Sequence, residues 1–134
     1  MKFRELIKVD SKGRITIPSS IREIFGIREG MSILIYADVD EKKIVLSPIP
    51  EQAKLVEIIA LVDDRPGVVA EMSKTLADRG VDIVALKCVV IKRGEVGECS
   101  FIVDLSKSII TDISELKELL SKLSFVKELT VNAM

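Results

Sequence analysis

Two adjacent acids, two cysteines and a group of lysines and arginines are the residues of this chain whose types could do chemistry. The 134 residues include no histidine, which excludes Ser-His-Asp and Cys-His catalysis and zinc held by histidine. Asp63 and Asp64 are neighbours in a turn, so their carboxylates need not converge on one reacting atom. The sequence has no metal-ligand cluster or phosphate-binding loop beside them. We therefore expect a protein that is not an enzyme and that holds no metal and no cofactor.

The two cysteines are too few for a disulfide framework or a four-thiolate metal site. Strand alternation places Cys88 on the same face as Leu86, and Cys99 on the same face as Phe101. We expect both faces to point into the core, where cysteine behaves as a small apolar side chain. A redox role would require an exposed thiolate beside positive charge.

Basic residues are concentrated near the start of the chain, although the formal net charge is only -1. Residues 1–50 hold nine Lys or Arg against seven Asp or Glu, and residues 51–134 hold eleven against fourteen. Within residues 1–22 the six cations exceed the two acids. A basic region on an acidic chain is typical of nucleic-acid binding, and a solvated surface with a chance excess of charge is the alternative.

The prolines at 48 and 50 mark the clearest boundary in the sequence, because proline breaks helices and interrupts strand pairing. We expect one domain at 1–48, a stiff linker at 49–54 and a second domain at 55–134. The composition is that of a folded α+β protein.

The first domain is predicted to contain two hairpins with one short helix between them. The first hairpin turns at 10–13, between strands at 7–9 and 15–17, and Pro18 begins the helix. A unit of this size seldom buries enough core to fold alone, which favours a dimer.

The second domain alternates strands and helices in the order β-α-β-β-α-β, which is that of the ferredoxin-like sandwich. Its strands are expected at 56–62, 83–91, 99–105 and 125–131. No stretch is apolar over the roughly 18 residues that a membrane span needs, and the N-terminus has no apolar signal segment. We therefore expect a soluble, cytoplasmic protein with no membrane partner.

Residues 9–30, VDSKGRITIPSSIREIFGIREG, resemble the SpoVT/AbrB family of swapped-hairpin DNA-binding domains, over about residues 5–48. Gly13-Arg14 and the Ile-Thr-Ile-Pro run after it are the main marks of the resemblance. The resemblance implies that two chains interleave their hairpins and that basic residues of the dimer contact duplex DNA. The residues that it places at the DNA are Lys8, Lys12, Arg14 and Arg22.

Two positions depart from the best-known members of that family. Ile7 and Glu23 stand where those members have arginines, which weakens the implied basic face. An ion pair between Arg14 and Asp10 within the turn is the alternative to DNA contact for Arg14.

Residues 61–86, LVDDRPGVVAEMSKTLADRGVDIVAL, resemble the ACT domain, a small regulatory module that binds amino acids, over about residues 55–133. The Asp-Arg-Pro-Gly turn and the helix after it carry the resemblance. The family binds its ligands between paired domains, at the first strand-to-helix loop and the start of the second strand. The residues at those places are Asp64, Arg65, Pro66, Gly67, Val68, Val69, Asp82 and Ile83.

The chemistry of these residues suits an amino acid. Gly67 has no side chain, so a ligand carboxylate can approach the amides at the start of the helix. Asp64 or Asp82 is placed to meet an α-ammonium group. Several amino-acid-binding relatives have Asn in place of Asp82. The ionised Asp82 side chain accepts hydrogen bonds and donates none, whereas the Asn side chain does both. The alternative is a domain that keeps the turn for folding and only pairs.

Together these features predict a prokaryotic transcriptional regulator that binds double-stranded DNA and responds to a small effector, an amino acid. The expected architecture is a small swapped-hairpin β domain followed by a ferredoxin-like ACT-type domain, assembled as a homodimer or a higher homo-oligomer. Two alternatives remain open: an antitoxin of a toxin–antitoxin pair, and a free-standing regulatory subunit of an amino-acid biosynthetic enzyme. The sequence does not specify the effector, the operator or the sign of regulation.

Overall fold

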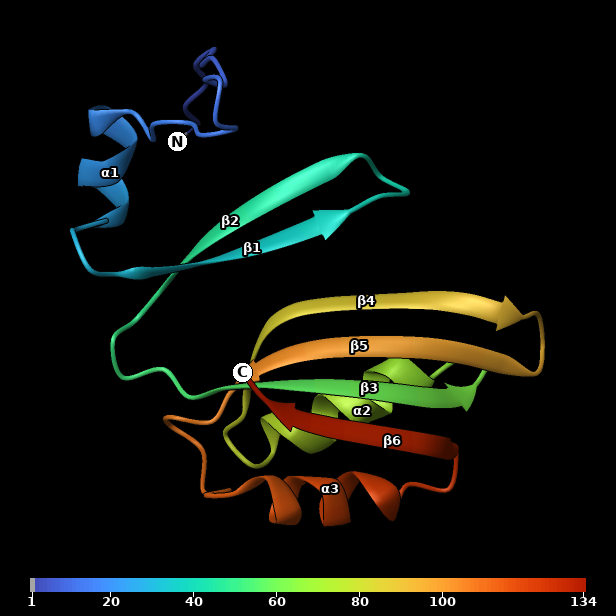
Figure 1. The fold of residues 1–134 in the computed structure, drawn as a ribbon. Coiled ribbons are helices and arrows are strands. Elements are labelled where there is room, and N and C mark those ends of the chain that lie inside the picture. The colour runs from blue at the N-terminus through green and yellow to red at the C-terminus, as the bar shows by residue number, and fades with distance from the viewer. Residues whose placement is uncertain (1) are drawn as a thin grey trace. The chain divides into compact units, whose positions relative to one another are not determined.

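The computed structural model describes residues 2–134, which fold into two units (Figure 1). The first unit ends at Glu51 and the second begins at Gln52. Each unit is described by itself. Among residues 2–134 no helix is both long and apolar enough to cross a lipid bilayer.

The first unit contains one helix and one two-stranded sheet. Helix α1 (Ser19–Phe25) ends at Gly26, whose φ of 63° is left-handed and readily adopted by glycine. Strands β1 (Ser32–Asp38) and β2 (Lys43–Ile49) pair antiparallel. Pro48 lies inside β2, opposite Ile33, so the expected interruption of pairing at this proline was wrong. Both strands of a two-stranded sheet are edges, and proline is tolerated there because one side of the strand needs no N–H donor.

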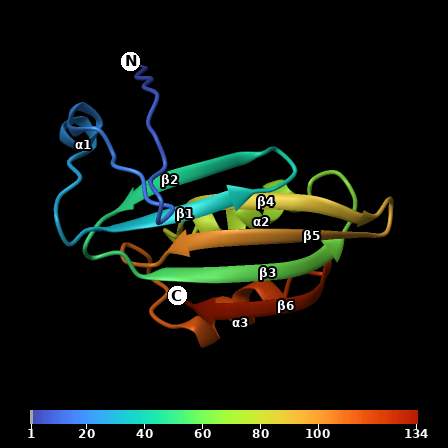
Figure 2. The same ribbon diagram turned by 45° about the horizontal axis from the view of Figure 1, so that its top comes forward.

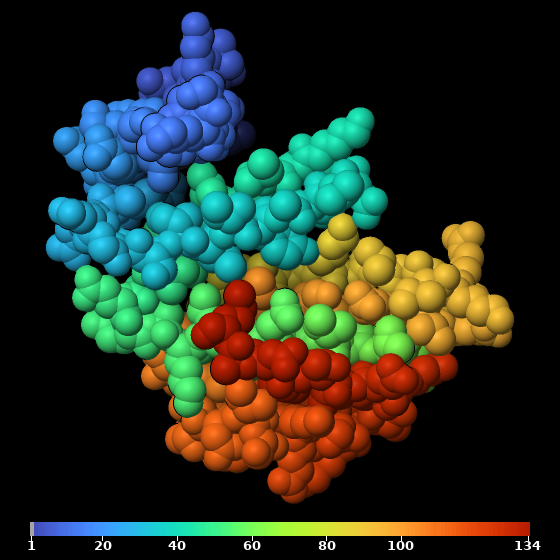
Figure 3. Space-filling model, viewed as in Figure 1, coloured from blue at the N-terminus to red at the C-terminus, as the bar shows by residue number. Residues whose placement is uncertain are grey.

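The N-terminal segment forms the predicted turn but not the strands on either side of it. The N–H of Asp10 donates to the carbonyl of Arg14 at 3.0 Å, and that of Gly13 donates to the carbonyl of Asp10 at 3.1 Å. Residues 2–18 contain no helix or strand, so the expected strands at 7–9 and 15–17 do not form within one chain. Figure 3 shows these dark-blue residues projecting from the rest of their own unit. The two segments were expected to pair with each other across the turn, but beyond the turn the structure gives them no strand pairing.

The first unit has almost no core of its own. Of residues 2–51 only Ile49 is buried, and Leu6 is fully exposed. Apolar side chains that stay exposed in this unit include Phe3, Ile7, Val9, Ile15, Ile24, Phe25, Ile35, Ile44 and Val45. So much exposed apolar surface is unusual for a monomeric unit.

The second unit is a four-stranded antiparallel sheet with two helices on one face (Figures 1 and 2). Its elements follow the order β3 (Leu55–Asp63), α2 (Val68–Ala77), β4 (Asp82–Lys92), β5 (Val96–Asp104), α3 (Ile113–Ser121) and β6 (Val126–Ala133). The strands lie side by side in the order β4-β5-β3-β6. The predicted α+β, ferredoxin-like β-α-β-β-α-β architecture is confirmed.

The core of the second unit lies between the sheet and its helices. Alternate residues of β3 and β5, among them Ile58 and Phe101, are fully buried. They pack with Met72 of α2, Leu116 of α3 and Phe125, which precedes β6. Strand β4 is an edge strand and most of its side chains are exposed. The second unit therefore has a complete core of its own and one open apolar edge.

Candidate functional site

A turn between β3 and α2 forms the centre of the candidate site, and the β4–β5 hairpin holds it in place. The Oδ2 atom of Asp64 accepts a hydrogen bond from the backbone N–H of Gly94 at 2.7 Å. The backbone N–H of Asp64 donates to the carbonyl of Glu95 at 3.2 Å. Asp64, expected to meet a ligand ammonium group, thus uses one carboxylate oxygen to position the turn.

The turn delivers the chain directly into the first turn of α2. Gly67 is the residue before the helix and has a φ of 92°, which only glycine adopts readily. No side chain caps this end of α2. Its first amides therefore keep hydrogen-bonding capacity for a ligand anion, and the helix dipole favours negative charge there.

A small cavity of about 90 Å³ opens beside this turn, between α2 and the strands β4 and β5. Its lining is mostly apolar: Val62, Val68, Val69, Val89, Val90, Gly97 and the two cysteines, with Asp63, Asp64 and Arg65 as the charged members. Four of the predicted ligand residues line it, namely Asp64, Arg65, Val68 and Val69. An apolar cavity with a few charged groups at one end is the usual form of a small-molecule site.

Charged groups gather on the other side of the turn, around Asp63. The Nε atom of Arg65 lies 3.6 Å from Oδ2 of Asp63, and the Nζ atom of Lys127 lies 3.8 Å from its Oδ1. The Arg65 guanidinium also lies 5.7 Å from the centre of the Phe125 ring. These contacts orient Arg65 while leaving half of its side chain exposed. Sequence reasoning missed Lys127 and Phe125, because they are about 60 residues from the turn along the chain.

Asp82 and Ile83 lie at the opposite end of the sheet from the turn. Asp82 pairs with Asp104, which pairs with Leu55 at the start of β3. The turn follows Asp63, at the other end of that strand. Eight residue steps of a strand span roughly 26 Å. A single chain therefore does not bring Asp82 and Ile83 to the turn.

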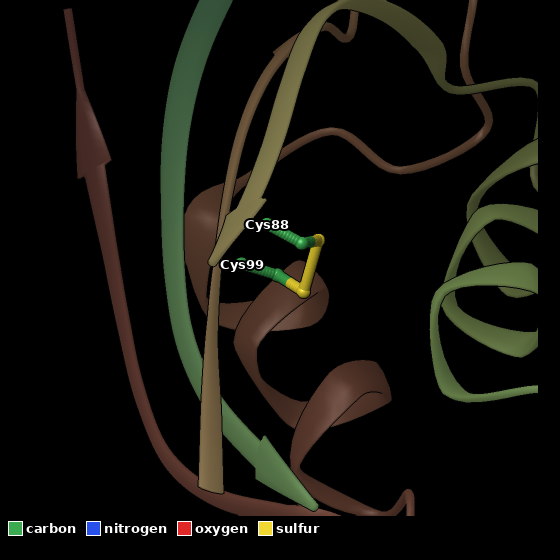
Figure 4. Close-up of a disulfide and its surroundings, with 2 residues drawn as sticks. All are labelled: Cys88 and Cys99. Carbon is green, nitrogen blue, oxygen red and sulfur yellow. A yellow bond between two sulfur atoms is a disulfide. The ribbon is translucent and has the colours of Figure 1, made fainter. Parts of the chain in front are cut away.

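The two cysteines form a disulfide between β4 and β5, and Figure 4 shows both side chains leaving neighbouring strands on the same side. Cys99 is buried as expected, with 2% of its surface exposed, whereas Cys88 is exposed. The prediction of two buried thiols was wrong, because Cys88 lies on an edge strand that no helix fully covers. Counting outward from the hairpin turn at Gly94 places Cys88 opposite Ser100, and only the register shift between Val90 and Lys92 brings it opposite Cys99.

The basic residues of the first unit are all exposed, and the structure groups two of them on one turn. Oδ1 of Asp10 accepts the backbone N–H groups of Lys12 and Arg14, each at 2.9 Å. The Nε atom of Arg14 donates to Oδ2 of Asp10 at 2.8 Å. The backbone and side-chain hydrogen bonds from Arg14 are the main reason why the pKa of Asp10 is lowered. Lys8 precedes this turn, and Arg22 lies on α1.

The same turn carries both alternatives that the sequence left open for Arg14. The ion pair with Asp10 is present, and 70% of the Arg14 side chain remains exposed. An exposed guanidinium that is paired through Nε can still offer its other N–H groups to a phosphate.

Comparison with known families divides the chain in two. Residues 6–54 match the family model described as antidote-toxin recognition MazE, bacterial antitoxin, and residues 56–127 match the ACT domain. Both resemblances predicted from the sequence are thereby confirmed. No curated protein matches the chain. A solved structure that this chain resembles is the solution structure of the C-terminal domain of the MgtC protein from Mycobacterium tuberculosis. It is 9% identical, covers 64% of this chain and 93% of its own, and has a TM-score of 0.49.

Proposed function

The chain belongs to the ACT domain family, with a MazE-type domain before its ACT domain, and on this premise we propose that it is a transcriptional regulator. The MazE-type domain binds duplex DNA as a dimer. The ACT domain binds an amino acid with an apolar side chain. The proposal places the protein in the cytoplasm, where it can reach chromosomal DNA.

The apolar cavity beside the uncapped start of α2 is the observation that supports effector binding most directly. An amino acid has a carboxylate, an ammonium group and a side chain, and each needs a different environment. The amides of α2 and the guanidinium of Arg65 suit the carboxylate. The valine-rich lining suits a small aliphatic side chain, because no ionised group other than those at the turn faces the cavity.

Pairing of two ACT domains through β4 would supply the ammonium partner. β4 is an edge strand with exposed apolar residues, including Val90 and Ile91, which are 59% and 58% exposed. Antiparallel pairing of two copies centred near Leu86 would bring the start of β4 of the partner subunit, which carries Asp82, alongside Val90. Val90 lines the cavity, so the start of β4 of the second copy would lie beside the site. The separation of Asp82 from the turn within one chain is then expected.

The first unit supplies the DNA-binding surface in this proposal. Its exposed apolar surface and unpaired N-terminal segment fit interleaving with a second copy. Each copy presents Lys8, Lys12, Arg14 and Arg22, so a dimer would present eight cations toward phosphates. An effector would regulate DNA binding if it bound the DNA-competent arrangement and the incompetent arrangement with different affinities.

Fluorescence anisotropy of a labelled duplex tests the DNA-binding part. We expect binding that weakens steeply between about 50 and 200 mM salt, because phosphate contacts release counterions. The double variant with Lys12→Ala and Arg14→Ala should lose most of this affinity. Lys117→Ala, which removes an exposed cation from α3 in the other unit, is the control and should bind as the native chain does.

Two results of these titrations would contradict the proposed function. Native protein that does not bind random or AT-rich duplexes at low salt would refute the DNA-binding part. Equal DNA affinity with and without a saturating amino acid would refute the regulatory part.

An antitoxin is the second candidate function, because the family model at residues 6–54 is described as that of a bacterial antitoxin. In toxin–antitoxin pairs of this kind the blocking segment is usually extended. Residues 55–133 instead form a domain with its own core. Co-purification of the native chain with a small ribonuclease would favour the antitoxin.

A further inference from the structure

The disulfide forms part of the wall of the candidate effector cavity. Cys88 and Cys99 both line it, together with Val68 and Val69 at the start of α2. The same cavity reaches the turn residues Asp64 and Arg65. A change in the two sulfur atoms would therefore change a surface that the effector contacts.

The two cysteines differ in how freely they can move. Cys99 is 2% exposed on a central strand and packs in the core with Phe101 and Val62. Cys88 is exposed on the edge strand β4. The register of β4 shifts on both sides of Cys88, between Ile83 and Ala85 and between Val90 and Lys92. Irregular pairing on an edge strand adjusts more easily than a central strand does. Any rearrangement of the pair will therefore fall on Cys88.

Reduction of the disulfide forces such a rearrangement. Two bonded sulfurs lie about 2.0 Å apart, whereas two non-bonded heavy atoms need about 3.5–4 Å. Cys99 is buried in the core, and both cysteine side chains line the cavity. The thiol of Cys88 will therefore move into the cavity or carry β4 outward, and both movements alter the cavity.

From this geometry we propose that the Cys88–Cys99 pair is a redox switch on the effector cavity. A dithiol reductant is oxidised to its own disulfide and passes two electrons and two protons to the pair. The S–S bond breaks, and Cys88 and Cys99 become thiols. The disulfide form has the cavity described above, and the dithiol form binds the effector more weakly.

The effect of the switch on effector binding rests on the proposed function, and so does the cytoplasmic location of the protein. Cytoplasmic proteins meet glutathione and thioredoxin, which keep most thiols reduced, and disulfides there are usually transient or sensing. An exposed cysteine at a ligand cavity fits that class better than a permanent cross-link does. By linkage, an effector that prefers the disulfide form will also make the pair harder to reduce.

Nuclear magnetic resonance of the full chain tests the switch without any ligand. The amide signals of Asp64, Arg65, Gly67, Val68 and Val69 are compared in the disulfide form and after treatment with dithiothreitol. We expect the chemical shifts of these amides to change. The chemical shifts of the amides of α3, whose residues do not line the cavity, should stay the same. Cys88→Ser should give the dithiol spectrum with or without reductant, and the exposure of this residue makes it a mild substitution.

Isothermal titration with L-valine, L-leucine and L-isoleucine then measures the effect on binding. We expect affinity about tenfold weaker after reduction, within the usual range for coupled sites. Cys88→Ser should bind weakly in both conditions, which separates the effect of the disulfide from that of the reductant.

The outcomes distinguish this proposal from the proposed function. Unchanged turn amides in a reduced form that is only less stable would make the disulfide a structural cross-link and overturn the switch. An amino acid that binds both forms equally would also overturn the switch while supporting the effector site. Turn amides that shift in a protein that binds none of the three amino acids would support the switch and refute the proposed effector.

Discussion

Asp64 accepts a hydrogen bond from the backbone N–H of Gly94 at 2.7 Å and so joins the turn before α2 to the tip of the β4–β5 hairpin. The two residues are 30 positions apart, and the hairpin also contributes the carbonyl of Glu95 to the N–H of Asp64. The position of the turn before α2 is therefore set by a distant hairpin as much as by its own residues.

Replacing Asp64 should reveal this coupling as a loss of stability. Asp64→Ala leaves the N–H of Gly94 without its charged acceptor, and we expect the free energy of unfolding to fall by about 1–2 kcal/mol. Asp64→Asn keeps one carbonyl oxygen and should lose less. Urea unfolding at 25 °C measures both.

Asp78→Ala is the matched control for that measurement. Asp78 pairs with Lys74 at 2.8 Å on the exposed face of α2, and exposed pairs of this spacing contribute about 0.5 kcal/mol or less. Losses of equal size in Asp64→Ala and Asp78→Ala would contradict a positioning role for Asp64.

Because of Asp104, the free energy of unfolding of the second unit should depend on pH. Its Oδ1 accepts the backbone N–H groups of Lys54 and Ser106, each at 2.9 Å, and its Oδ2 accepts the hydroxyl of Ser106 at 3.0 Å. Burial tends to raise the pKa of Asp104, but these hydrogen bonds outweigh burial and lower it below 3.8. A folded-state pKa below the unfolded value stabilises the fold above that value, and the stabilisation is lost as the pH falls through the folded pKa.

The corresponding variant is Asp104→Asn. We expect it to be less stable than the native chain at pH 7 by about 1 kcal/mol, because a charged acceptor is replaced by a neutral one. The difference should shrink as the pH falls below 3.8, because the unfolded chain then takes up the Asp104 proton before the folded chain does. Urea unfolding from neutral pH to about pH 3 measures it, and a difference that stays constant over this range would contradict the argument.

The sequence predicts the second unit well because its information is local. Alternation along β3 and β5, and the apolar spacing of α2 and α3, each specify an element and its buried face. The N-cap of α3 is an example: Asp112 accepts the N–H of Glu115 at 2.9 Å, within four residues of sequence.

The features that the sequence did not predict depend on distant or missing partners. Alternation assigns Cys88 to the helical face of β4 correctly, but alternation does not show that β4 is an edge strand. Residues 7–9 and 15–17 have a strand pattern, yet they do not pair with each other in one chain. Lys127 and Phe125 reach the candidate site only through the pairing of β6 with β3.

Asp10 should restrain DNA binding by pairing with Arg14. Asp10→Asn keeps a carbonyl oxygen for the N–H groups of Lys12 and Arg14 and removes the negative charge beside the guanidinium. We expect severalfold tighter binding to a random duplex at low salt. The dependence of log K on log salt should steepen, by about 0.9 for each additional phosphate that the protein neutralises.

Glu118→Gln provides the control for that measurement, because it removes the same charge from α3 in the other unit. It should leave the anisotropy titration and its salt dependence unchanged. If Asp10→Asn bound no more tightly than Glu118→Gln, the ion pair with Asp10 would have no bearing on DNA binding.

Leu86 is the position at which to test pairing through β4. It lies near the middle of that edge strand, it is 39% exposed, and it does not line the cavity. In an antiparallel pair centred on Leu86 the two copies of this residue are neighbours, so Leu86→Lys would set two ammonium groups against each other. The loss of pairing would also remove Asp82 of the partner subunit from the cavity. We expect binding of L-valine, L-leucine or L-isoleucine to weaken about tenfold or more, while duplex binding through the first unit persists.

Ile109→Lys, at a loop position that is 74% exposed, adds the same charge outside β4 and should bind as the native chain does. Native affinity in Leu86→Lys would mean that one chain holds the complete site and that Asp82 has no part in it.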